Sequence, residues 1–160
     1  MANVVAVCGC KDSGKTTLVN GIVEKLSGEG LRVAVIKHDG HDFACDIPGT
    51  DTYRFTESGA YATACFSDKR LFVHRTGTGD TLGDIIGMFP EADLIIVEGC
   101  KGSTLPKIEV IRKGVSDHAV SNPEGRFLIA TDWPDGHFGE AQADLNDIGT
   151  IVKEIRRVCL

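Results

Sequence analysis

Short apolar runs rich in β-branched residues recur along the chain and are separated by longer polar or amphipathic stretches. Runs of this kind are typical of parallel strands that are buried on both faces. They occupy residues 4–8, 31–37, 93–99, 106–112 and 126–132. The pattern therefore predicts a mostly parallel β-sheet.

Helical periodicity occurs between and after these runs. Residues 17–26 carry an apolar side chain at every fourth position, and residues 148–158 form another amphipathic stretch. A short helix over 81–89 would end at Pro90. Because strand, helix and strand in this order form a crossover between parallel strands, we expect an α/β fold in which helices flank the sheet.

One region departs from this alternation. Residues 38–60 read as a polar loop, and residues 61–67 and 70–76 are short strand-like runs separated by Asp68 and Lys69. Such a pair predicts a β-hairpin, which we expect to be an insertion attached to the main sheet. Since no repeat, low-complexity tract or linker divides the chain, residues 1–160 are expected to form a single domain.

Composition limits the partners that this fold could have. The chain has 160 residues, 42% hydrophobic and 25% charged, as in an ordinary globular domain. Its net charge of −6 argues against broad binding of nucleic acid or anionic membranes. No stretch approaches the roughly 20 apolar residues of a membrane span, and the N-terminus leads into a glycine-rich loop rather than an export signal. We expect a cytoplasmic protein. Because the net charge is negative, any positive charge that binds an anion must be confined to a local site.

The glycine-rich loop GCKDSGKT, at residues 9–16, lies between the first predicted strand and the first predicted helix. A glycine, four residues and then Gly-Lys-Thr is the spacing of a phosphate-binding loop, the P-loop of NTPases. Lys15 could reach the outer phosphates of a nucleotide, and the Thr16 hydroxyl could bind Mg²⁺. The candidate nucleotide-binding residues are Gly9, Cys10, Lys11, Asp12, Ser13, Gly14, Lys15, Thr16 and Thr17. The alternative is a glycine-rich turn with an exposed lysine, which the flanking strand and helix disfavour.

Glu98 ends the strongly apolar run DLIIVEG at residues 93–99. In a parallel sheet, ligands lie beyond the carboxyl ends of the strands. A carboxylate there could bind Mg²⁺ together with Thr16, or orient water for attack on a γ-phosphate, so Glu98 and Lys15 are the candidate catalytic residues. Alternatively, Glu98 is a solvated residue that only ends the strand.

The segment 38–54, HDGHDFACDIPGTDTYR, follows the second predicted strand and so opens on the same edge of the sheet. It carries a dense set of polar side chains: His38, Asp39, His41, Asp42, Asp46, Asp51 and Arg54. The spacing does not show which aspartate would meet Mg²⁺, and Asp39 and Asp46 join Thr16 and Glu98 as candidate metal ligands. Aspartate and glycine are also ordinary turn residues, which leaves a purely structural loop as the alternative.

The six cysteines show neither a C-x-x-C pair nor the spacing of a disulfide framework. In a reducing compartment most of them would act as small buried apolar side chains. His38, His41 and Cys45 could still bind a soft metal with help from Cys8 or Cys10. Their spacing matches no standard zinc pattern, which favours the plainer interpretation.

Three segments taken together resemble one known family. GCKDSGKTTL, then VAVIKHDGHDF with DIPGTDTYRF, then DLIIVEGCKGSTLPKIEVIR are similar, in this order, to the MobB family, the molybdopterin-guanine dinucleotide biosynthesis protein B. The P-loop alone is shared with a very large class of NTPases, whereas the combination is much more specific. The resemblance extends from Val4 to the last predicted helix.

The resemblance implies a GTP-binding homodimer of P-loop α/β fold and a weak Mg²⁺-dependent GTPase. Such a protein would assist a nucleotidyltransferase partner, MobA, in attaching a guanine nucleotide to molybdopterin, which is itself a further candidate ligand. By matching positions, residues 9–17 would hold phosphates, and Asp132 would lie where related folds place a base-reading carboxylate. A carboxylate can accept the hydrogens that guanine offers at N1 and N2. The equal alternative is that Asp132 only ends a strand before Trp133 and Pro134.

Departures from related NTPases bear on the mechanism. Cys10 stands where related dimeric NTPases carry a second loop lysine, and Lys11 is displaced by one position, so Lys11 receives no role across a dimer interface. No glutamine or arginine is clearly placed to orient water or contact the γ-phosphate, which suits slow hydrolysis. Other functions stay open: a metallochaperone GTPase that carries a transition metal, or a small-molecule kinase or ligase that uses ATP.

Overall fold

The computed structural model describes residues 3–41, 43–77 and 79–160, and the chain divides into two compact units. The first, here called the sheet unit, contains the chain up to His38 and again from Asp84 to Leu160. The second, the hairpin unit, is the intervening segment Asp39–Gly83. Asp42, one of the loop aspartates named above, lies outside the described residues.

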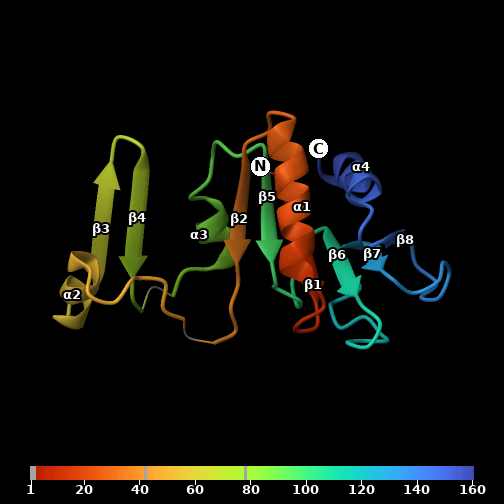
Figure 1. Ribbon diagram of the computed structural model, residues 1–160, viewed down its shortest axis with the longest axis horizontal. Coiled ribbons are helices and arrows are strands. Elements are labelled where there is room, and N and C mark those ends of the chain that lie inside the picture. Colours follow the sequence, from red (N-terminus) through yellow and green to blue (C-terminus); the bar gives the residue numbers. More distant parts are fainter. Residues whose placement is uncertain (1–2, 42, 78) are drawn as a thin grey trace. The chain divides into compact units, whose positions relative to one another are not determined.

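The sheet unit is built on a six-stranded sheet in the order β2-β5-β1-β6-β7-β8 (Figure 1). Every neighbouring pair of strands is parallel, which confirms the predicted parallel α/β fold. The strands are β1 (Val4–Gly9), β2 (Val33–Lys37), β5 (Leu94–Glu98), β6 (Lys107–Ile111), β7 (Arg126–Thr131) and β8 (Gln142–Asp144). The three residues of β8 are too few for a periodic pattern, and the sequence did not predict this strand.

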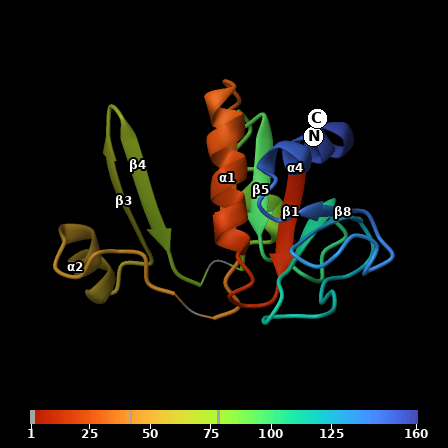
Figure 2. The ribbon, with the colours of Figure 1, turned by 45° about the vertical axis from the view of Figure 1, so that its right-hand side comes forward.

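Two helices, α1 (Lys15–Gly28) and α4 (Ile148–Cys159), pack on one face of this sheet and can be followed in Figure 2. Their apolar side chains form one core with alternate residues of the strands, because successive strand side chains point to opposite faces. The centre of this core contains Val5, Val7, Ile22, Leu26, Ile96, Ile108, Ile151 and Ile155. Gly21 lets the helices approach closely, since a Cβ atom there would lie 2.9 Å from Cδ1 of Ile148.

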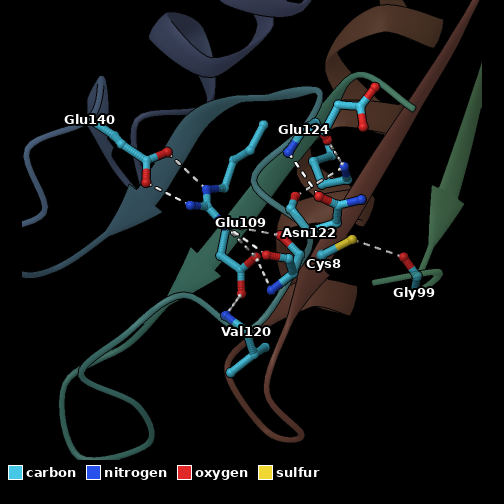
Figure 3. A network of polar contacts seen from close by, with 10 residues as sticks. Cys8, Gly99, Glu109, Val120, Asn122, Glu124 and Glu140 are labelled. Carbon is cyan, nitrogen blue, oxygen red and sulfur yellow. Dashed lines mark hydrogen bonds and ion pairs between the residues drawn. The ribbon is translucent and has the colours of Figure 1, made fainter. Parts of the chain in front are cut away.

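The opposite face of the sheet carries a buried polar network (Figure 3). Lys107 and Glu109 alternate with the core residues of β6, and both are almost completely buried. The Lys107 amino group donates to two backbone carbonyls of the segment 120–124. The Glu109 carboxylate accepts hydrogen bonds from two backbone amides of the same segment, at 3.0 and 3.1 Å. These contacts hold the segment against the sheet and satisfy groups that would be costly to bury unpaired.

Arg126, on β7, links this network to the loop that precedes β8. Its guanidinium lies 4.0 Å from the Glu109 carboxylate and donates to the two carboxylate oxygens of Glu140 at 2.8 and 2.6 Å. The hydrogen bond lowers the pKa of Glu140 and raises that of Arg126. A bidentate pair of this kind fixes both the distance and the orientation of its partners.

The hairpin unit contains β3 (Ala62–Ser67) and β4 (Arg70–Arg75), which pair antiparallel as predicted. The expectation that this hairpin is attached to the main sheet is wrong, because within the described ranges β3 and β4 form a separate two-stranded sheet. The turn at residues 68–69 is a local signal that favours antiparallel pairing of the two adjacent strands. Joining a larger sheet depends on tertiary contacts that no local pattern encodes.

Two short helices also differ from the sequence prediction. Helix α2 (Asp51–Glu57) lies in the segment expected to be a loop, and the Thr50 side chain caps it by accepting a hydrogen bond from an amide in its first turn. Because α2 buries none of its residues, it shows no apolar stripe by which to predict it. Helix α3 (Leu82–Ile86) is shorter than the expected 81–89. In the part of the chain that the structure describes, no helix is long and apolar enough to cross a membrane.

We expect Glu109→Gln to lower the free energy of unfolding by about 3 kcal/mol. The substitution removes the negative charge of the buried Glu109–Arg126 pair. It also replaces one of the carboxylate oxygens that accept backbone hydrogen bonds by an NH₂ group, which is a donor and would face a backbone amide. Glu124→Gln is the matched control, because that side chain is exposed, and it should change the free energy by less than about 0.5 kcal/mol. Urea unfolding followed by circular dichroism measures both variants. Equal unfolding midpoints would contradict a stabilising role for Glu109.

Candidate nucleotide-binding site

The parallel pairing of the strands gathers several functional side chains at one edge of the sheet. Val7 of β1 pairs with Glu98 of β5, and Gly9 pairs with Val110 of β6. On the outer side, Lys37 of β2 pairs with Glu98. The carboxyl ends of these strands therefore lie level with the glycine-rich loop, at the edge where parallel sheets bind ligands.

The backbone of the glycine-rich loop has the conformation that its glycines predict. Gly9 has a φ of 142°, and a Cβ atom on it would lie only 2.5 Å from the carbonyl oxygen of Val110. Gly14 has a φ of 98° and is the N-cap of α1. Asp12 also has a positive φ, of 61°, although it is not a glycine. The loop is thus tightly folded between β1 and α1, as phosphate binding requires.

Unsatisfied donors in this loop fit an anionic ligand. Ser13 is completely buried, and its hydroxyl oxygen makes no hydrogen bond with the described residues. Among the side chains that the structure describes, none caps the N-terminus of α1, and no acidic residue lies in its first turn. The first amides of a helix lack partners within the helix, and its dipole favours negative charge there. Phosphate oxygens would satisfy both requirements.

Lys15 lies at the start of α1, and its side chain reaches back over the loop. Its ammonium group donates a hydrogen bond of 2.5 Å to the carbonyl oxygen of Cys10. The positive charge is therefore held over the loop and beside the helix N-terminus. This is the position that the sequence analysis assigned to a phosphate-binding lysine.

Thr16 and Glu98, 82 residues apart in sequence, are in direct contact. The Thr16 hydroxyl lies 3.0 and 3.1 Å from the two carboxylate oxygens of Glu98. Glu98 is buried, and the ammonium group of Lys37 is 4.0 Å from one of its oxygens. The structure thus brings together the two residues that the sequence analysis placed on a common metal ion. Carboxylate and hydroxyl oxygens suit Mg²⁺, which usually takes few protein ligands and completes its shell with water and phosphate.

Asp132, the candidate base-reading residue, follows β7 at the same edge of the sheet. Its Oδ1 accepts a 2.7 Å hydrogen bond from the backbone amide of Lys113, which fixes the turn after β6. The ammonium group of Lys113 lies 5.7 Å from the centre of the Trp133 ring. Asp132 is exposed and, among the described residues, its Oδ2 accepts no hydrogen bond, so one oxygen has a structural role while the other faces solvent.

Asp39 and Asp46, the other candidate metal ligands, belong to the hairpin unit. Oδ1 of Asp39 accepts a hydrogen bond from the amide of His41 at 3.2 Å. Oδ1 of Asp46 accepts from the amide of Ile47 and from two threonine hydroxyls near the start of α2. These contacts shape the loop before α2. Their role as metal ligands stays a prediction.

The structure places Cys8, a proposed helper of the soft-metal site, in the interior of the protein. Cys8 is completely buried, its thiol donates to the carbonyl oxygen of Gly99, and burial raises its pKa to about 11. Metal ligation would require loss of the thiol proton and of its bond to Gly99, so the structure gives Cys8 a structural contact and its help to a metal site stays a prediction. Within residues 3–41, 43–77 and 79–160, no three His, Cys, Asp or Glu side chains are arranged to hold a metal ion.

Arg112 is a residue that the sequence analysis did not identify. It follows β6 directly, and its Nη1 atom lies 3.8 Å from the position that a Cβ atom would occupy on Gly14. The sequence did contain a signal for this position. Arg112 is the last residue of the apolar run 106–112, just as Glu98 lies near the end of the run 93–99, and polar side chains at the ends of parallel strands are candidates for ligand binding. What the sequence did not show is that β6 is the strand next to β1.

A parallel sheet whose central strand leads through a glycine-rich loop into a helix, with Thr16 against Glu98, defines a P-loop nucleotide-binding protein of α/β fold. The family model of MobB, the molybdopterin guanine dinucleotide synthesis protein B, matches residues 4–132. The chain therefore belongs to the MobB family.

Individual relatives agree with this assignment. The chain is 30% identical over 134 residues to the molybdopterin-guanine dinucleotide biosynthesis adapter protein of Haemophilus influenzae, an alignment that covers 82% of this chain and 75% of that protein. It is 30% identical over 155 residues to the protein of the same name from Escherichia coli, with 92% and 88% covered. The crystal structure of a MobB protein homolog from Bacillus stearothermophilus matches with a TM-score of 0.71 at 27% identity, covering 97% of this chain and 99% of that chain.

We expect Lys15→Ala to weaken nucleoside triphosphate binding by about tenfold to a hundredfold, since a charge-assisted hydrogen bond contributes roughly 1.5–3 kcal/mol. Folding should change little, because the side chain is only half-buried and takes no part in the core. Lys153→Ala, which removes an exposed lysine from α4, is the control for net charge. Fluorescence titration with a labelled GTP gives the affinities. Unchanged affinity in a folded Lys15→Ala protein would exclude this loop as the phosphate site.

Proposed function

We propose that this protein binds GTP and acts as an adaptor in the synthesis of the molybdopterin-guanine dinucleotide cofactor. The observation that carries the proposal is membership of the MobB family, whose relatives in Haemophilus influenzae and Escherichia coli are named adapter proteins of this synthesis. The proposed partner is the nucleotidyltransferase of the same synthesis, a MobA-like protein, in the cytoplasm. Molybdopterin is a further proposed ligand.

Mg²⁺ is the proposed metal of the GTP site, with Thr16 and Glu98 as its protein ligands. Their contact at 3.0 and 3.1 Å supports this assignment, because it places a hydroxyl and a carboxylate side by side, and both are oxygen ligands that suit Mg²⁺. When bound, Mg²⁺ would neutralise charge on the phosphate groups. Lys15 would add a second positive charge, and Glu98 would orient a water molecule near the terminal phosphate. Such a site supports weak hydrolysis of GTP.

Selectivity for guanine is proposed to come from Asp132. Its Oδ1 is held by the amide of Lys113, which leaves Oδ2 to accept hydrogen bonds from N1 and N2 of the base. Adenine presents no such pair of donors on its corresponding edge. The proposed site thus extends from the glycine-rich loop after β1 to the end of β7.

Titration with fluorescent GTP and ATP analogues, with and without Mg²⁺, tests this function. We expect GTP-selective and Mg²⁺-dependent binding by protein whose content of transition metal, assayed on the same sample, is negligible. Asp132→Asn should shift the preference away from GTP, because its amide keeps an oxygen for Lys113 but turns a donor toward the base. The variant should fold normally, which thermal unfolding checks.

Other outcomes would contradict the proposal in distinct ways. Preference for ATP would favour a small-molecule kinase or ligase. A stoichiometric transition metal would favour a metallochaperone GTPase and direct attention to His38, His41 and Cys45. An unchanged ratio of GTP to ATP affinity in Asp132→Asn would leave Asp132 only its structural bond to Lys113.

A homodimer is also part of the proposal, and the hairpin supports it. Phe66 pairs with Leu71 and Ala64 pairs with Val73, so their side chains share one face of the two-stranded sheet. That face is open, since Phe66 is 82% exposed and Leu71 is 72% exposed. A two-stranded hairpin is only marginally stable alone and is usually covered by another element. We therefore propose that a second copy of the chain covers this face.

Leu71→Glu should convert the dimer to a monomer, because it places a charge in the apolar face of the hairpin. Lys69→Glu, in the exposed turn of the same hairpin, is the control and should leave the dimer intact. Size-exclusion chromatography with light scattering measures both masses at matched concentrations. A monomeric unsubstituted protein, or a Leu71→Glu variant that stays dimeric, would contradict this interface.

A further inference from the structure

The position of Arg112 is determined by the sheet rather than by a flexible loop. β6 pairs with β1 so that Val110 lies opposite Gly9, the first residue of the glycine-rich loop. Arg112 comes two positions later and therefore extends past the end of β6 at the ligand edge. Its Nη1 atom lies 3.8 Å from the Cβ position of Gly14, the N-cap of α1.

The backbone on the far side of Arg112 is fixed as well. The carbonyl oxygen of Arg112 accepts hydrogen bonds from the amides of Val115 and Ser116, at 3.0 and 2.9 Å. The next amide, that of Lys113, donates to Asp132 at 2.7 Å. A strand precedes Arg112 and a hydrogen-bonded turn follows it, so the backbone of this residue is held on both sides. Its guanidinium therefore reaches the glycine-rich loop from a well-defined backbone position.

Among the described residues, no acidic side chain pairs with the guanidinium of Arg112. Arg75, Arg126 and Arg156 form ion pairs with Asp80, Glu140 and Glu29. In the described part of the chain, by contrast, the guanidinium of Arg112 makes no hydrogen bond or ion pair, although the protein carries a net charge of −6.

Arg112 also lies beside another positive feature. The N-terminus of α1 carries the positive end of the helix dipole, without an acidic residue in its first turn to offset it. An anion bound between two neighbouring positive features would be attracted by both of them. The buried Ser13 hydroxyl, which has no partner among the described residues, belongs to the same loop and needs an acceptor or donor there.

We propose that Arg112 binds the phosphate chain of the nucleotide and forms, with Lys15, a cationic pair around the glycine-rich loop. The planar guanidinium can donate two parallel hydrogen bonds to phosphate oxygens, which an ammonium group cannot do. Arg112 would thus be the arginine that contacts the phosphates, and it comes from the same chain as the glycine-rich loop. This assignment rests on the proposed function, because it takes the GTP site as given.

The test compares Arg112→Ala, Arg112→Gln and Arg112→Lys with Arg157→Ala, which removes an exposed arginine from α4 and matches the change in charge. Labelled GTP gives the affinity, and inorganic triphosphate serves as a competitor that has a phosphate chain but no base. Arg112→Ala and Arg112→Gln should weaken the binding of both by about tenfold or more. Arg112→Lys should recover part of the loss, whereas Arg157→Ala should resemble the unsubstituted protein.

Each outcome has a definite meaning. Failure of the unsubstituted protein to bind GTP would overturn the proposed function itself. Normal binding by the unsubstituted protein together with undiminished GTP and triphosphate binding by Arg112→Ala would overturn only the role of Arg112. A loss of GTP affinity with unchanged inhibition by triphosphate would also overturn it, since the contact would then be to the base. Thermal unfolding without nucleotide verifies that the variants are folded, and the exposed position of Arg112 predicts that they are.

Discussion

The structure depends above all on the parallel pairing of β1 with β5 on one side and β6 on the other. This pairing buries β1 on both faces and brings the ends of three strands level at one edge. Gly9, Glu98 and Arg112 reach that edge from positions more than ten residues apart in sequence. The tight fold of the loop follows from the same constraint, because the carbonyl oxygen of Val110 leaves no room for a side chain on Gly9.

The two faces of the sheet are covered by different means. Apolar side chains of α1 and α4 cover one face, and this burial is the main source of stability for such a fold. On the other face, Lys107 and Glu109 hold the segment 120–124 through its backbone groups. A buried charge is stable only when its hydrogen bonds are satisfied. The network thus specifies one path for a segment that leads from β6 toward β7 and Asp132.

The electrostatics of the site are local and differ in sign from those of the whole chain. The protein has a net charge of −6, but the N-terminus of α1, the ammonium of Lys15 and the guanidinium of Arg112 all lie around the glycine-rich loop. The contact between Thr16 and Glu98 places a hydroxyl and a carboxylate together at the same edge of the sheet. This arrangement is the basis of the proposed sites for the phosphates and Mg²⁺ of a nucleotide in this member of the MobB family.

Local patterns in the chain predicted the strands 4–8, 93–99 and 126–132, the helices after residues 16 and 147, and the phosphate-binding spacing of Gly9, Gly14, Lys15 and Thr16. These features are local, because β-branched runs, helical periodicity and glycine spacing act over a few residues. The folded chain was needed to show that Thr16 contacts Glu98, that Arg112 lies close to Gly14, that Cys8 is buried and that β3 and β4 form a sheet of their own. Those facts depend on the order of strands in the sheet, and no short stretch of sequence encodes which distant strand becomes a neighbour.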